Sequence, residues 1–175
     1  MIQADSVREA LRRCLGSVLA DDALVEGIRR VLEHYRPGKD TYSDLAGQME
    51  HFLFNSLYDR LGPGMSFRSD DGCRRRILLS DLPLLADQML FPLFEGLKPW
   101  SVDYERLYAW WMESGSWSAM FALILVFRDF LPAQDRLVIS RVIQENVPPR
   151  LWPAGLSALI AETAGPGRGN RPPES

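Results

Sequence analysis

The stretch "AWWMESGSWSAMFALILVF", Ala109–Phe127, decides the fold because it is the most apolar part of the 175-residue chain and holds three of its five tryptophans. A membrane-spanning helix needs about 20 mostly apolar residues. The run Trp117–Phe127 is too short, with Ser-Gly-Ser before it and Arg-Asp after it. We therefore predict that it does not span a membrane. A helix that is apolar on nearly all sides is typical of the centre of a helical domain, so Trp117–Phe130 is expected to be a core helix with Ser116 as its N-cap.

The remaining sequence has the pattern of consecutive helices. Apolar residues recur at three- and four-residue steps, and Pro, Gly or capping residues separate the segments. No segment shows sustained strand alternation. The expected helices lie within residues 5–20, 21–38, 41–64, 80–97, 102–113, 117–130, 133–146 and 151–163. The sequence thus predicts an all-α fold, a single domain over 1–163 made of antiparallel helical hairpins or a bundle, followed by a disordered Pro/Gly-rich tail at 164–175.

Composition restricts the class of protein. The apolar fraction of 46% and charged fraction of 25% are those of a soluble globular protein. The net charge of −3 argues against a nucleic-acid-binding protein, which usually carries a basic stripe. Cys14 and Cys73 form no CxxC pair, and the N-terminus has no signal-peptide pattern. We expect a cytoplasmic protein with neither nucleic acid nor membrane as its partner.

Catalytic and metal-binding motifs are not found. His51 belongs to a polar stripe on one helix, but a single histidine without a second ligand at close spacing does not predict a metal site. Cys73 precedes three arginines that could activate it, yet no histidine lies near it in sequence to act as base. We expect no cofactor, no metal and no catalytic residue. An enzyme whose dispersed residues Asp44, His51, Asp59 and Cys73 meet in a cleft remains the alternative.

Two segments are candidate partner-binding sites. In "MSFRSDDGCRRR", residues 65–76, the acids Asp70 and Asp71 precede Arg74, Arg75 and Arg76. This pattern is either a charge-balanced loop or an interface, where arginine is enriched.

The second candidate is "VDYERLYAWWME", residues 102–113. Helical phase places Tyr104, Leu107, Tyr108 and Trp111 on one face, and Trp110 on roughly the opposite, charged face. If Trp111 is core, Trp110 is exposed near arginine, as binding hot spots favour. The other interpretation is a helix buried on two sides, with Trp110 in the core. The candidate residues here are Tyr104, Tyr108 and Trp110.

Two resemblances add function hypotheses. The segment "LYAWWMESGSWSAMFALIL" resembles one helical pair of HEAT-like proteins, which implies a scaffold for a peptide or nucleic acid, although no basic residue lies between Glu113 and Arg128. In size, charge and helical architecture the chain is similar to bacterial immunity proteins. That resemblance implies a non-enzymatic protein-binding module that neutralises a toxin by covering its active site with acidic and aromatic side chains. We take this as the leading hypothesis.

Overall fold

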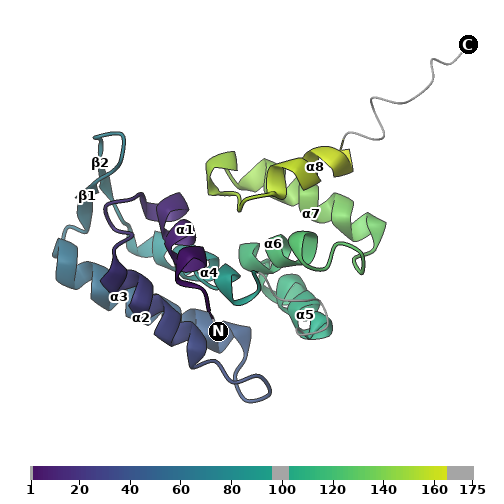
Figure 1. Ribbon diagram of the computed structural model, residues 1–175, viewed down its shortest axis with the longest axis horizontal. Coiled ribbons are helices and arrows are strands. Elements are labelled where there is room, and N and C mark those ends of the chain that lie inside the picture. The colour runs from purple at the N-terminus through teal and green to yellow at the C-terminus, as the bar shows by residue number, and fades with distance from the viewer. Residues whose placement is uncertain (1, 96–102, 165–175) are drawn as a thin grey trace, which may run out of the picture. The chain divides into compact units, whose positions relative to one another are not determined.

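The protein is all-α, as the sequence predicts (Figure 1). The structure is a computed structural model and describes residues 2–95 and 103–164. Within them it has eight α-helices, three 3-10 turns and one small hairpin. The chain divides into two compact units, unit 1 (Met1–Glu95) and unit 2 (Gly96–Ser175). The predicted disordered tail lies outside the described residues except for position 164, which ends the last helix.

Unit 1 is a cluster of four helices built around the third. Its helices are α1 (Ala4–Leu15), α2 (Asp22–Glu33), α3 (Tyr42–Leu61) and α4 (Leu82–Gln88), with 3-10 turns η1 (Leu79–Asp81) and η2 (Phe91–Leu93). Helix α3 contacts both α2 and α4 and buries Met49, Leu53 and Leu57 completely. Gly27 allows close packing of α2 on α3, because a Cβ there would lie only 2.2 Å from Cζ of Phe52.

Unit 2 is organised around the apolar segment. Its elements are α5 (Tyr104–Ser114), α6 (Trp117–Leu125), α7 (Ala133–Asn146), the 3-10 turn η4 (Pro149–Leu151) and α8 (Leu156–Ala164). Helix α6 contacts α5, α7 and α8, and every residue from 118 to 124 is buried. Ser116 caps it by accepting a hydrogen bond from the Ala119 N–H at 3.1 Å. The predicted core helix is therefore confirmed. No helix in the described ranges has both the length and the hydropathy needed to cross a membrane.

Two helix boundaries in unit 2 differ from the prediction. Helix α6 ends at Leu125, where the expected helix ran to Phe130, which is 64% exposed. The Phe127 N–H bonds the Ala122 carbonyl, five residues back, at 3.3 Å, and this wider turn ends the helix. Helix α8 begins at Leu156 rather than Leu151. Pro149 and Pro153 lack amide hydrogens, so the intervening segment forms only a 3-10 turn.

A β-hairpin in unit 1 was not predicted. Strand β1 (Ser66–Arg68) pairs antiparallel with β2 (Arg74–Arg76), so that Ser66 faces Arg76 and Arg68 faces Arg74. Three residues are too few to show an alternating pattern. The one sequence signal for a hairpin turn is the Asp71-Gly72 dipeptide, because Gly72 at the tip adopts a positive φ of 81° that glycine tolerates.

Candidate partner-binding surfaces

Asp70 holds the hairpin to the turn that follows α1. Its carboxylate accepts hydrogen bonds from the Ser17 N–H, at 2.9 and 3.1 Å, and from the Ser17 hydroxyl at 3.1 Å. The neighbouring Gly16 leaves room for this contact, because a Cβ there would lie 3.2 Å from Oδ1 of Asp70. The sequence makes Asp70 a candidate partner-binding residue, but both of its carboxylate oxygens accept hydrogen bonds from Ser17 of the same chain.

Asp71 shapes the hairpin tip. Its Oδ1 accepts hydrogen bonds from the Ser69 hydroxyl and, at 3.0 Å, from the Cys73 N–H. Arg75 lies 3.6 Å from Oδ2. The Ser69 hydroxyl first, then the Cys73 N–H and the Arg75 charge, lower the pKa of Asp71 from 3.8 to about 2. Asp71 is thus a turn-forming residue that also neutralises Arg75.

The tip should loosen in acid. A carboxyl group whose pKa is lowered by folding stabilises the fold above its unfolded pKa, and this contribution is lost as pH falls through the folded pKa. We expect the turn to be fully formed above the unfolded pKa of Asp71, which is 3.8, and to open as the pH falls toward the folded pKa of about 2. An NMR titration of the Cys73 amide and the Asp71 carboxyl carbon measures this. Asp71→Asn should abolish the transition at Cys73, and an unchanged transition in that variant would contradict the assignment.

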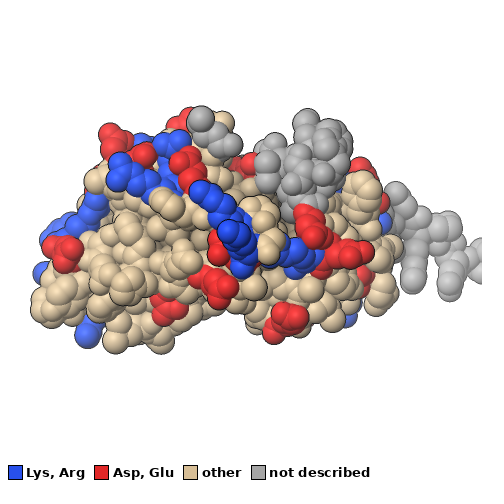
Figure 2. Space-filling view, turned by 90° about the horizontal axis from the view of Figure 1, so that it is seen from below, with Lys and Arg blue, Asp and Glu red and all other residues tan. Residues whose placement is uncertain are grey.

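The remaining hairpin arginines form one charged face. Arg68, Arg74 and Arg76 share a face of the hairpin, opposite Phe67 and Arg75, because side chains alternate along a strand. Among the described residues none of these three has an ion-pair partner within 4.0 Å. We call these three residues the arginine face. On the side of the molecule drawn in Figure 2, basic and acidic side chains are interspersed.

Trp110 is a core residue. It is 6% exposed, and Leu107, three residues earlier, is fully buried. The structure therefore decides between the two interpretations in favour of burial, and exposed Trp110 as a hot spot is corrected. The sequence left both interpretations open, because Tyr and Trp can place their polar tips in water while their rings pack, so an aromatic stripe need not mark the core face.

The aromatic residues that adjoin this buried face of α5 are half-buried. Tyr104, Tyr108 and Trp111 follow each other at helical spacing, and we call them the α5 aromatic row. The Tyr104 and Tyr108 ring centroids are 5.9 Å apart, and the Tyr108 and Trp111 centroids are 5.3 Å apart at 87°. Tyr104 also packs on buried Phe127, with centroids 5.3 Å apart. Each ring thus has a fixed neighbour and an accessible part.

Asp135 of α7 fixes the centre of this row. The Tyr108 hydroxyl donates a hydrogen bond to Oδ2 of Asp135 at 2.9 Å. This bond, with burial, raises the pKa of Tyr108, and burial followed by the Asp135 charge raises the pKa of Tyr104. Both tyrosines therefore stay neutral and keep their hydroxyl protons for hydrogen bonding at ordinary pH. Val138 lies three residues after Asp135 on α7 and is 41% exposed.

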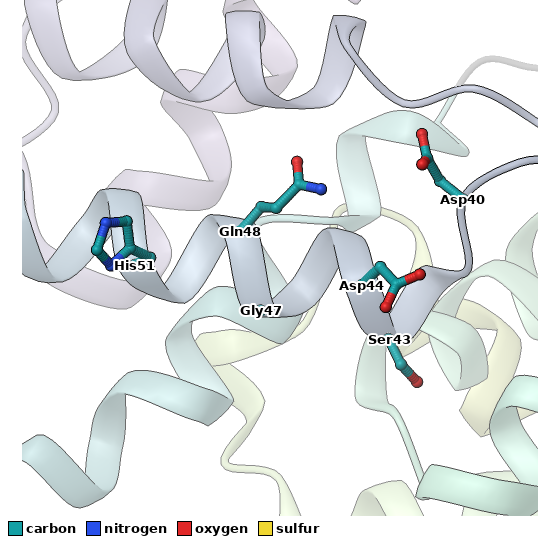
Figure 3. A pocket seen from close by; sticks show the side chains of 6 residues that line it. All are labelled: Asp40, Ser43, Asp44, Gly47, Gln48 and His51. Carbon is teal, nitrogen blue, oxygen red and sulfur yellow. The ribbon is translucent and has the colours of Figure 1, made fainter.

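The residues of the enzyme alternative do not converge into an enclosed site. An open depression of about 620 Å³ is lined by Asp40, Ser43, Asp44, Gly47, Gln48 and His51. All come from α3 or the turn before it, and in Figure 3 their side chains point in different directions. Asp44 caps α3 by accepting from the Thr41 N–H at 3.3 Å, and the Asn55 amide lies 3.1 Å from Nε2 of His51. Cys73 and Asp59 do not line this depression. No cluster of three metal-ligating side chains occurs in the described ranges.

Comparison of the chain with protein-family models, with curated proteins and with solved structures gives no match.

Proposed function

We propose that the protein is a non-enzymatic protein-binding module and that the α5 aromatic row is its main contact surface. The observation that carries this is the arrangement of Tyr104, Tyr108 and Trp111, which are half-buried. Phe127 packs on Tyr104, Asp135 binds Tyr108, and Tyr108 packs on Trp111. Tyrosine and tryptophan are enriched among the residues that dominate binding energy at interfaces. Rings that are already ordered lose little conformational entropy when a partner covers them.

Exposed apolar side chains in the same unit support a protein partner. Met112, the residue after Trp111, is 63% exposed, and Phe130, Leu137 and Val138 are also exposed. Large apolar side chains that a fold leaves exposed are typical of surfaces that bind other proteins. The mixed distribution of charge in Figure 2 favours a protein partner over a polyanion.

The mode of action that we infer is occlusion. A rigid aromatic surface without an enclosed pocket acts by covering a partner's functional site, as the resemblance to immunity proteins implies for a toxin. The second candidate, an enzyme that uses His51, has one supporting observation, which is that His51 and Asp44 line the same open depression. The α5 aromatic row favours the binding function because a neighbouring side chain of the same protein fixes each of its rings.

Affinity capture tests the proposal. The tagged chain is used as bait in a lysate of the source organism at low and moderate salt, and bound proteins are quantified by mass spectrometry. We expect one protein in a stoichiometric complex whose own activity falls when the complex forms. Absence of any protein enriched over the tag alone, at either salt concentration, would contradict the proposal.

A further inference from the structure

The outer edge of β2 carries backbone groups that the hairpin does not use. The Ile77 N–H bonds the Met65 carbonyl, and the Ser69 N–H bonds the Cys73 carbonyl, both at 2.9 Å. Bonded and non-bonded pairs alternate along an antiparallel ladder, so Phe67 and Arg75 form the bonded pair between them. The N–H and C=O groups of Arg74 and Arg76 therefore point away from β1.

This edge is accessible. All three residues of β2 are exposed, and Figure 1 shows the hairpin standing at one end of unit 1 beyond its helices. Within the described residues, the backbone groups of Arg74 and Arg76 have no hydrogen-bond partner. Two donors and two acceptors are thus in register to pair with an added strand.

The side chains at this edge determine which strand fits. Arg74 lies directly opposite Arg68, and Arg76 lies two residues along on the same face. Like charges directly opposite each other on one face of a sheet destabilise the pair. Since Asp71 neutralises only Arg75 on the other face, the arginine face holds an uncompensated positive charge. A strand with carboxylates at alternate positions would bring one acid beside each guanidinium.

We propose that the β2 edge binds an extended acidic segment of a protein partner by strand addition, with alternate Asp or Glu side chains against the arginine face. A second copy of the chain does not fit, because its own β2 edge would bring arginine against arginine. A nucleic acid would use the guanidinium groups but not the row of backbone groups, and the chain's net charge of −3 repels a polyanion. The partner class rests on the proposed function, whereas the site lies in unit 1 and does not involve the α5 aromatic row.

Defined peptides test this site without knowledge of the natural partner. The probe is a labelled peptide of alternating Thr and Glu, compared with its Thr–Lys counterpart and with a Thr–Glu peptide N-methylated along one edge. We expect the Thr–Glu peptide to bind and the other two to bind at least about tenfold more weakly, because each lacks either the charge or the hydrogen bonds. The amides of Arg74 and Arg76 should become protected from hydrogen exchange in the complex.

Charge variants of the full chain complete the test. Arg74→Glu/Arg76→Glu should weaken binding of the Thr–Glu peptide by about tenfold or more. If this charge reversal disturbs folding, Arg74→Ala/Arg76→Ala replaces it and should also weaken binding. The control Arg30→Glu/Arg141→Glu makes the same charge change at two exposed arginines outside the hairpin and should bind as the native chain does.

Two peptide results would overturn the proposal: no binding of the Thr–Glu peptide, or equal binding of its N-methylated form. A third is that a single-stranded oligonucleotide displaces the peptide and depends on Arg74 and Arg76 as strongly as the peptide does. Trp111→Ala should bind the peptide normally. Failure at the hairpin would therefore leave partner capture through the α5 aromatic row as a separate question.

Discussion

Replacing Trp110 by alanine is expected to lower the free energy of unfolding by about 3–5 kcal/mol, because it leaves a large cavity beside α5. The same change at Trp111 should cost about 1 kcal/mol, since that ring is only half-buried and loses mainly its contact with Tyr108. Urea denaturation followed by circular dichroism measures both values. The two tryptophans are adjacent, so each variant is the natural control for the other.

This pair also separates stability from binding. A Trp111→Ala protein that stays folded but loses its partner would place the contact surface on the half-buried side of α5. Equal destabilisation by the two substitutions would show instead that both rings are core, and the α5 aromatic row would lose its role as a binding surface.

Replacing Phe121 by alanine should destabilise the protein by a similar amount, about 3–5 kcal/mol. Phe121 lies at the centre of α6, where every residue from 118 to 124 is buried, and is itself 1% exposed. The matched control is Phe130→Ala, the same chemical change at a residue that is 64% exposed, which should alter stability by no more than about 0.5 kcal/mol. Comparable losses at the two positions would contradict the assignment of α6 as the core helix of unit 2.

The apolar stretch Ala109–Phe127 divides into the end of α5 and the core helix α6. A helix apolar on all sides can only be accommodated where neighbours surround it, so α6 and its serine cap were predictable from Ser116 onward. Its last turn was not, because the end of the helix depends on a backbone hydrogen bond from Phe127 that no side-chain pattern encodes.

The candidate surfaces were predictable as segments but not as contacts. The sequence identified the arginines of residues 74–76 together with Tyr104 and Tyr108, but it named Trp110 rather than Trp111 as their partner-binding neighbour. Asp135 lies 27 residues from Tyr108, and Ser17 lies 53 residues from Asp70, so both partners are set by packing rather than by local spacing. Trp110 was ambiguous for the same reason, since helical phase gives relative directions and not which direction faces the core.

The sequence predicts one domain, whereas the chain forms two compact units. Each unit has its own buried centre, α3 in unit 1 and α6 in unit 2. The two proposed surfaces fall in different units, the arginine face in unit 1 and the α5 aromatic row in unit 2.

The most direct test of the central claim is the dissociation constant of the purified complex between this chain and its captured partner, measured for the native protein, Trp111→Ala and Arg141→Ala. A binding surface on the α5 aromatic row predicts that Trp111→Ala weakens the complex by about thirtyfold or more, the effect of losing a hot-spot side chain, while exposed Arg141 on α7 serves as the control with native affinity. A folded Trp111→Ala protein that binds its partner as tightly as the native chain would contradict the account.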